Sequence, residues 1–424
     1  MTEPQWNPRT LEEDCRLLKG FFQENGASTK KEPSGFLTHR FLVPGGCFYS
    51  DTLWDWDSWL SGVMLGQVEL DGQREGEFFD YQAGCIQNFF DMQRPDGSIP
   101  ICATSQGIMS DDGLSFEGRN PHKPVLLQHA AFLVQHYGRI DWLRPLAAQF
   151  QPYLKAFLAE HIHEKTGLAY WQNDFAVGVD NDPSVFYRPE KSCGSIYLNS
   201  LLHKEMKACA FLLERCGDNP GAAFWRAQAD RLRMAVNRHC WDERDGTYYS
   251  VDFNLLPICP EHWLHQGAPR HWDCLLMRID NWSSFLPLWA GIPDRQQAQR
   301  MVFRACDPET FSCRGGIRTL SRLEKMYSLH ATNNPSNWLG PVWGISNYLV
   351  FRGLVRYGFY TEARELAEKT IRLFAEDLGK EGALHEYYHP DTGEGMMTPG
   401  FLNWNGLVLQ MIAWLEGRKT AWEF

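Results

Sequence analysis

Helical periodicity recurs along nearly the whole chain, with no low-complexity linker to divide it. Apolar residues repeat at intervals of three and four, as in Leu126, Leu127, Ala130, Ala131 and Val134, which is typical of helices with one buried face. We expect helices at residues 10–24, 56–71, 74–93, 124–139, 141–159, 195–216, 220–240, 281–291, 294–305, 338–357, 360–378 and 400–417. Strand patterns are sparse, and YYSVDF near residue 248 is the best candidate. This pattern predicts an all-α fold of consecutive helix hairpins, each with one inner and one outer helix.

Length and composition narrow the class of protein. A chain of 424 residues buries enough surface to be stable without disulfides, and its 12 Cys include no C-x-x-C pair, so we expect reduced thiols. The net charge of −11 argues against nucleic acid or anionic membrane as a partner. The opening MTEPQWNPRT lacks a signal-peptide core, and no run of about 18 apolar residues predicts a membrane span. We expect a soluble, cytoplasmic, single-domain protein, residues 1–424, with 1–40 as an N-terminal helix and lead-in.

Long connections and frequent Trp mark where function is expected. The stretches 94–123, 161–193 and 306–337 exceed ordinary connection lengths, and loops that long in a compact domain are usually functional. The chain has 17 Trp, many of them in loops beside acids and amides. A Trp ring has a flat apolar face and one N–H donor, which suits sugars; a Trp-rich core is the alternative for any single Trp.

Two loop segments carry candidate catalytic acids. Hydrolysis of a glycoside needs a proton for the leaving oxygen and either a base-activated water or a carboxylate nucleophile. YWQNDFAVGVDNDPSVF, residues 170–186, offers Asp174, Asp180 and Asp182 beside aromatic side chains that can raise a carboxyl pKa by desolvation. GALHEYYHPDTGEG, residues 382–395, offers Glu386, whereas Glu394 resembles a solvated turn acid. Turn-forming Asp residues are the alternative for the first segment.

Further clusters place polar groups beside aromatic residues. They are FYSDTLWDWDSW at 48–59, QRPDGSIP at 93–100, NPHKPVLLQ at 120–128 and NNPSNWLGPVWGISNY at 333–348. For the leading Asp of the first cluster, a helix N-cap is an equal alternative. All of the clusters precede expected helices, so in a barrel they would line one mouth.

Together these segments resemble the clan of (α/α)6-barrel glycosidases that holds the trehalases and the family 63 glycoside hydrolases. The small bacterial mannosylglycerate and glucosylglycerate hydrolases are the most similar, over residues 40–415. WDSW at 56–59 is similar to a motif whose Asp grips the glycone, GVDNDP at 178–183 to the general-acid segment, and HEYYHPDTGEG at 385–395 to the base segment. GGIRTLS at 315–321 and NWLGPVW at 337–343 resemble active-site loops. The chain departs from the family pattern at Leu339, Lys123 and Asp182.

The resemblance implies an (α/α)6 barrel with long active-site loops and an inverting glycoside hydrolase. Asp180 would act as general acid and Glu386 as general base, with the two carboxyl groups roughly 6.5–9.5 Å apart. No metal or cofactor is expected, because no Cys/His cluster or Asp-rich loop has ligand spacing. The expected substrate-binding residues are Trp54, Trp56, Asp57, Gln93, Lys123, Gln128, Trp171, Gln172, Asn181, Arg188, Arg318, Trp338, Gly340, Trp343, Tyr387 and Trp404.

The expected substrate is a small α-glucoside or α-mannoside, either a disaccharide or a glycosylglycerate. A glycerate carboxylate would need a cation, for which Lys123, Arg188 and Arg318 are candidates; without one, a neutral disaccharide is favoured. Two other functions stay open. A sugar 2-epimerase can use the same barrel but usually needs a His pair for proton transfer, and a sugar-binding protein would need neither acid.

Overall fold

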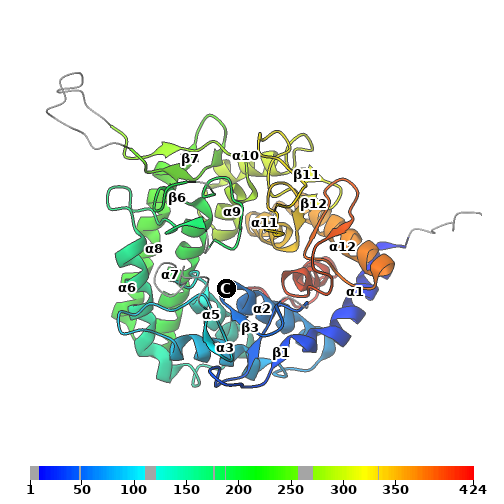
Figure 1. The fold of residues 1–424 in the computed structure, drawn as a ribbon, viewed down its shortest axis with the longest axis horizontal. Helices are drawn as coiled ribbons and strands as arrows, with labels where there is room; N and C mark the ends of the chain where they lie inside the picture. Colours follow the sequence, from blue (N-terminus) through cyan, green and yellow to red (C-terminus); the bar gives the residue numbers. More distant parts are fainter. Residues whose placement is uncertain are drawn as a thin grey trace, which may run out of the picture.

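The computed structural model shows a ring of helix hairpins (Figure 1). The structure describes residues 9–46, 49–109, 121–174, 177–186, 188–255, 271–332 and 334–424. Within these residues, twelve α-helices alternate along the chain between an outer and an inner position. The outer helices are α1 (Leu11–Asn25), α3 (Phe79–Asp91), α6 (Ala147–His161), α8 (Asn219–His239), α10 (Arg295–Ala305) and α12 (Tyr360–Glu381). The inner helices are α2 (Asp55–Gly72), α5 (Leu126–Tyr137), α7 (Ile196–Cys216), α9 (Leu286–Ala290), α11 (Gly344–Tyr357) and α13 (Val408–Leu415).

Burial separates the two sets of helices, as the periodicity predicts. In α2 every residue from Asp55 to Glu69 is buried, and α13 is buried from Val408 to Ala413. The outer helix α12 buries one face and exposes the other, where Arg364 and Glu365 lie. A helix enclosed on all sides must be apolar or hydrogen-bonded all round, whereas an outer helix needs only one apolar stripe. The predicted all-α barrel is therefore confirmed.

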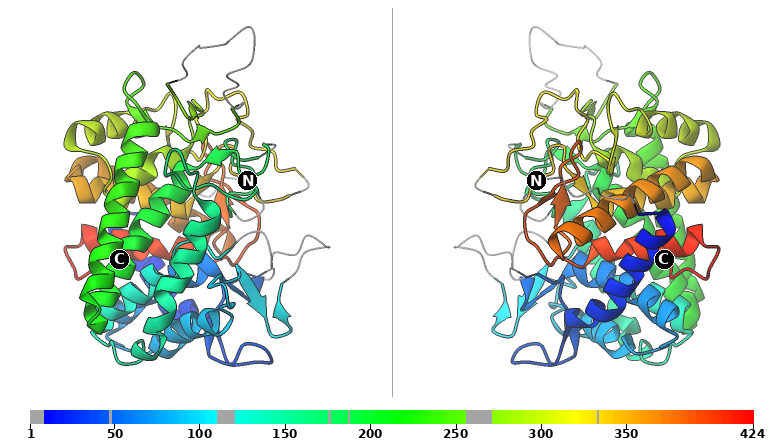
Figure 2. Two further views of the ribbon diagram at one scale, coloured as in Figure 1. Left: turned by 90° about the vertical axis from the view of Figure 1, so that its left-hand side faces the viewer. Right: turned by 90° about the vertical axis from the view of Figure 1, so that its right-hand side faces the viewer.

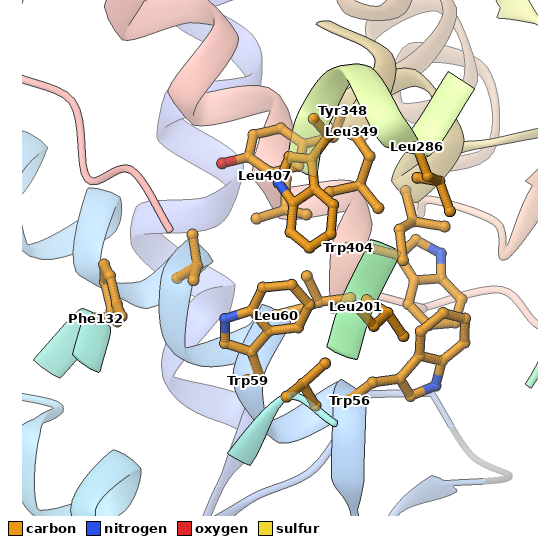
Figure 3. Close-up of a cluster of buried hydrophobic side chains, with 14 of the residues drawn as sticks. Trp56, Trp59, Leu60, Phe132, Leu201, Leu286, Tyr348, Leu349, Trp404 and Leu407 are labelled. Carbon is orange, nitrogen blue, oxygen red and sulfur yellow. The ribbon is translucent and has the colours of Figure 1, made fainter. Parts of the chain in front are cut away.

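The inner side chains meet in one core around the barrel axis. Figure 3 shows Trp59 and Leu60 of α2 meeting Leu201 of α7 and Leu349 of α11, with Trp56 and Trp404 beside them. Among the described residues, this packed core fills the space between the inner helices.

Five of the expected helices begin five or more residues later than predicted. The segments 74–93 and 141–159 become α-helical at Phe79 and Ala147. The segment 338–357 is helical only from Gly344, because Val342–Trp343 form a strand. The segments 281–291 and 400–417 begin with 3-10 turns, Trp282–Phe285 and Trp404–Leu407, ahead of α9 and α13. Tertiary contacts ahead of these helices override the helical periodicity.

Short strands join the loops at one end of the barrel. One sheet has the order β3 (Thr52–Trp54), β4 (Cys102–Thr104), β5 (Gly107–Ile108), and another has the order β13 (Val342–Trp343), β14 (Tyr387–Tyr388), β15 (Gly395–Met396). All pairs are antiparallel, with Trp343 opposite Tyr387. The others are β1 (Lys30–Lys31), β2 (Phe41–Leu42), β6 (Cys193–Gly194), β7 (Trp241–Asp242), β8 (Thr247–Tyr248), β9 (Val251–Asp252), β10 (Leu275–Leu276), β11 (Ser312–Cys313) and β12 (Gly316–Ile317). The predicted strand near 248 is divided between β8 and β9. Two-residue strands leave no alternation for sequence reading to detect.

The opposite end of the barrel is filled by the C-terminal segment, which Figure 2 shows on the face away from the β3–β5 strands. Arg352 Nε donates to the Glu423 carboxylate at 2.8 and 3.0 Å. Trp289 Nε1 donates at 3.0 Å, Tyr348 donates through its hydroxyl, and Lys204 Nζ lies 3.8 Å away. Burial alone would raise the pKa of Glu423, but Arg352 and Lys204 hold it at about 2. We call these five residues the closed-end cluster.

Two other predictions concern the cysteine side chains and membrane-spanning helices. The cysteines among the described residues are free thiols, as expected. In the described part of the chain, no helix combines the length and apolar character needed to cross a membrane.

Candidate active site

A hollow of about 490 Å³, partly open to solvent, lies where the loops ahead of the inner helices converge. We call it the site hollow. Its described lining consists of Tyr49, Trp54, Trp56, Asp57, Gly178, Asp180, Ser336, Trp338, Trp343, Glu386, Phe401 and Trp404. Asp57 lies in the first turn of α2, Trp343 is the N-cap of α11, and Trp404 begins the turn ahead of α13. The structure thus gathers clusters that are far apart in the sequence at one mouth.

Asp180 enters the hollow from the loop that precedes α7. Its Oδ2 accepts a hydrogen bond from Asn334 Nδ2 at 3.3 Å. Burial raises the pKa of the Asp180 carboxyl, and hydrogen bonds from Ser336 and Asn334 oppose that rise. A carboxyl group whose pKa is raised by burial can hold a proton near neutral pH and release it to a ligand.

Glu386 reaches the same hollow from the residue before β14 and is only 5% exposed. Tyr49 Oη donates to Glu386 Oε1 at 3.2 Å. Burial raises the pKa of Glu386, the negative charge of Asp180 adds to the rise, and hydrogen bonds from Thr398 and Tyr49 oppose it. Burial and nearby carboxylates raise the pKa of Tyr49 as well, so its hydroxyl remains a donor that orients Glu386.

The backbone opposite Glu386 adopts an uncommon conformation. The Glu386 N–H donates to Met397 O at 3.3 Å, and both Met397 and Thr398 have positive φ, at 59° and 30°. Side chains other than glycine seldom adopt these angles, and such residues cluster at functional sites. Here the turn brings Thr398 within hydrogen-bonding reach of Glu386.

Asp57 is the third acid of the hollow. Burial, with the negative charge of Asp55 added, raises the pKa of Asp57 to about 8, and Lys123 works against that rise. Asn403 Nδ2 donates to Asp57 Oδ1 at 2.6 Å. Among the described residues no other side chain donates to this carboxyl group, so its second oxygen can bind a ligand hydroxyl.

Aromatic rings form the walls. Trp338 stacks on Trp343 with centroids 3.8 Å apart and planes at 10°, and Trp56 lies 5.3 Å from Trp404. The indole N–H groups of Trp54 and Trp404 are buried without a hydrogen-bond partner among the described residues. Because buried donors are nearly always satisfied, these two indoles are available for hydroxyl groups of a bound molecule.

Several predicted polar residues lie outside the lining and bond to the protein itself. Gln93 Nε2 donates to Gly97 O at 3.0 Å, and Gln128 Nε2 donates to Pro124 O at 2.8 Å. Gln172 Nε2 donates to Glu190 Oε2 at 3.2 Å. These amides brace the loops around the hollow.

The three predicted cations are each engaged in an ion pair. Lys123 Nζ lies 3.1 Å from Asp55 Oδ1, Arg188 pairs with Asp252 at 2.7 Å, and Arg318 pairs with Asp391 at 2.9 Å. None of the three belongs to the described lining of the hollow.

Other predicted residues support the walls from behind. Trp171 packs against Tyr197, and Tyr387 stacks on Trp343 at 4.8 Å. The Trp338 N–H donates to Asn181 Oδ1 at 2.7 Å. Gly340, at φ 139°, leaves no space for a Cβ beside the Tyr327 ring.

Sequence reasoning did not select Tyr49, Ser336 and Phe401 as site residues, although all three line the hollow. Each lies within a few residues of a selected one, in FYSDTLW, NPSNW or FLNW. Proximity to a motif was the only signal for them, because nothing local shows which side chain faces inward.

Comparison with known proteins adds independent findings. The profile of a family described as mannosylglycerate hydrolase MGH1-like glycoside hydrolase domain matches residues 52–405. The mannosylglycerate hydrolase of Rubrobacter radiotolerans is 29% identical over 226 residues, 52% of this chain and 44% of that one. A probable trehalase of Eremothecium gossypii is 26% identical over 429 residues, 87% of this chain and 51% of that one. The chain thus spans about half the length of these curated relatives.

Among solved structures, the mannosylglycerate hydrolase of glycoside hydrolase family 63 from Thermus thermophilus, in complex with glucose, aligns with a TM-score of 0.64 at 20% identity. The alignment covers 96% of this chain and 100% of that one. The neutral trehalase from Saccharomyces cerevisiae aligns with a TM-score of 0.62 at 17% identity, covering 88% of this chain and 73% of that one. At these identities the likeness concerns the fold.

Proposed function

Because the chain belongs to the mannosylglycerate hydrolase MGH1-like family of glycoside hydrolases, and is therefore a glycosidase, we propose that it is an exo-acting, inverting α-glycosidase for small α-glucosides or α-mannosides. Asp180 is the general acid and Glu386 the general base. The observation that carries the proposal is that both carboxyl groups line one Trp-walled hollow and that burial raises both pKa values.

In the proposed reaction, the Asp180 proton passes to the glycosidic oxygen as its bond to the anomeric carbon breaks. Glu386 takes a proton from a water whose oxygen forms the new bond on the opposite face. The Tyr49 hydroxyl, donating to Glu386 Oε1 at 3.2 Å, favours the ionised form that a base needs. The separation of about 6.5–9.5 Å that inversion requires stays a prediction.

The glycone is held by Asp57 and the rings of Trp56 and Trp404. A carboxyl group beside a Trp ring can bind two sugar hydroxyls while the ring packs on the C–H face. The available indole N–H groups of Trp54 and Trp404 supply two more hydroxyl contacts. These contacts fit a single terminal sugar, as an exo-acting enzyme requires.

The leaving group is proposed to be neutral. Lys123, Arg188 and Arg318 are each held by a protein carboxylate, so a glycerate carboxylate would have to compete with Asp55, Asp252 or Asp391 for them. An α-linked disaccharide carries no carboxylate and needs no cation in the leaving-group site. Glycosylglycerates remain the second substrate class, as the family name suggests.

Proton NMR of the first-formed anomer tests the proposal on a panel of α-linked glucosyl and mannosyl disaccharides and glycosylglycerates. Hydrolysis that releases the β-anomer first supports inversion, whereas α-anomer first would contradict it. Interconversion of a free sugar would indicate an epimerase, and binding without turnover would indicate a sugar-binding protein. Among the described residues no His lines the site hollow, so the His pair that an epimerase usually needs has no counterpart there.

A further inference from the structure

Lys123 is buried directly behind the site hollow, bound to an equally buried Asp55. Their side chains are 3% and 0% exposed. Lys123 Nζ donates to both Asp55 oxygens, at 3.1 and 3.3 Å, and the Lys123 N–H donates to Oδ2 at 2.9 Å. The Trp56 N–H donates to Oδ1 at 2.7 Å. A buried ion pair with this many hydrogen bonds is held in one geometry, because moving either side chain would leave a buried charge without its counter-charge.

The same lysine touches two parts of the site from behind. Its ammonium lies 5.3 Å from the centroid of the Trp56 ring, close enough for a cation–π contact. A Cβ added to Gly178 would lie 3.0 Å from Lys123 Cε and 3.0 Å from Trp56 Cζ2. Gly178 is two residues before Asp180 and has φ 73°. The lysine stem and the ring thus form the surface on which the acid loop rests.

We propose that Lys123 is a positioning residue for the general acid: its stem fixes the loop that carries Asp180, and its buried positive charge stabilises the Asp180 carboxylate formed when the proton leaves. This inference rests on the proposed function. It differs from the sequence expectation that Lys123 binds substrate, because the ammonium is directed to Asp55 and not into the hollow.

Electrostatics agree with the geometry. The charge of Lys123 lowers the pKa values of both Asp180 and Asp57, against the larger opposing influence of burial. A stronger acid gives up its proton more readily as the glycosidic bond breaks. The titratable groups that face the ammonium are Asp55, Asp57, Cys102, His122 and Asp180.

The closed end of the barrel offers a matched control. Lys204 is also buried, lies 4.2 Å from the centroid of the Trp289 ring and pairs with Glu423 at 3.8 Å. It resembles Lys123 in burial and ring contact and also lies near a carboxylate, but it is remote from the site hollow. Its Nζ makes no hydrogen bond among the described residues, and burial lowers the pKa of Lys204. Lys204→Met therefore reports what the loss of a buried lysine does to stability alone.

The experiment compares three variants with the parent protein. They are the single variant Lys123→Met, the double variant Lys123→Met/Asp55→Asn, and the control Lys204→Met. Stability is measured by urea unfolding, and kcat and KM are measured across pH on the best substrate of the panel. The double variant leaves no unpaired charge at this position, so it should recover stability even if Lys123→Met alone folds poorly.

We expect kcat of both Lys123 variants to fall by about 10- to 100-fold, with KM changed by less than about threefold. The alkaline limb of kcat should move to higher pH, because Asp180 loses a neighbouring cation. Lys204→Met should keep the parent kcat and pH profile. Recovery of kcat together with stability in the double variant, or an unmoved alkaline limb, would overturn the inference.

A readout independent of turnover separates this inference from the proposed function. Hydrogen exchange of the segment 177–182, followed by mass spectrometry, should speed up in the double Lys123 variant and stay unchanged in Lys204→Met. An inactive parent protein would refute the proposed function and, with it, the role in acid catalysis. An active parent whose segment 177–182 exchanges equally in all variants would refute the positioning role alone.

Discussion

The two ends of the barrel bury carboxyl groups in opposite ways. At the closed end, Glu423 is surrounded by Arg352, Lys204 and two further donors, and its pKa is held at about 2. At the mouth, burial raises the pKa values of Asp57, Asp180 and Glu386. Neutral donors to Asp180 and Glu386, and the charge of Lys123 near Asp57 and Asp180, only partly oppose the rise, since Lys123 is itself paired with Asp55. A fully paired carboxylate stabilises the fold, whereas an under-paired one costs stability and can exchange a proton with a ligand. Stability and chemistry are therefore separated along the barrel axis.

The largest expected effect is on chemistry at the mouth. Asp180→Asn and Glu386→Gln should each cut turnover by about 10²–10⁴-fold or more, because neither amide can donate or accept the required proton. Steady-state kinetics on the best substrate provides the measurement. Glu394→Gln, an exposed acid on the same loop as Glu386, is the control and should keep parent activity. Near-normal turnover in either acid variant refutes its assignment.

The next largest effect is on stability at the closed end. Glu423→Gln should lower the free energy of unfolding by about 3–5 kcal/mol, because Arg352 and Lys204 would be left buried without their counter-charge. Urea unfolding measures the loss, and kcat per folded molecule should change less than about twofold. Glu416→Gln, a 31% exposed acid paired with Lys19, should cost less than about 1 kcal/mol. Equal losses in the two variants would contradict the distinction between the ends.

The pH dependence of stability sharpens the same contrast. The folded pKa of Glu423 is about 2, below its ordinary value of 4.5, so the stabilisation of about 3 kcal/mol is fully present above pH 4.5. It is lost as pH falls from 4.5 toward 2. The stability difference between the parent protein and Glu423→Gln should therefore be constant above about pH 5 and shrink below it. A difference that grows on acidification would contradict the pairing.

The smallest expected effect has the opposite sign. The folded pKa of Asp57 is about 8, above the unfolded value of about 3.9. Between these values the unfolded chain is ionised while the buried acid keeps its proton, so the free energy of unfolding falls as pH rises. Asp57→Asn should raise the free energy of unfolding at pH 7 by about 1–2 kcal/mol while it weakens sugar binding. Calorimetry and substrate titration measure both changes, with Asp51→Asn as the exposed control. A loss of stability would argue against an under-paired Asp57.

Much of the fold was readable from local patterns. The expected helices are present because apolar spacing of three and four residues needs only neighbours along the chain, and they alternate between inner and outer positions as hairpins predict. The later starts of α11 and α13 could not be predicted from local sequence patterns. There, β13 pairs with β14, and the residues before α13 face the hollow.

The candidate site was only partly readable. Asp57, Asp180, Glu386 and most of the selected Trp residues line the hollow, because acids beside aromatic residues in long loops are a local signal. Gln93, Gln128 and Lys123 were selected as polar residues of the segments that flank a long loop, and they face protein partners instead. Their direction depends on groups that no local pattern reveals.

The sequence by itself determined the alternation of helices, the supply of carboxyl groups and Trp rings, and the loops that carry them, since these follow from the order of neighbouring residues. The tertiary structure decided which carboxyl groups are paired and which are not. Tyr49 and Glu386 are 337 positions apart, and Asn334 and Asp180 are 154 apart. A pKa depends on distances through space, and only the closed ring of helices sets those distances.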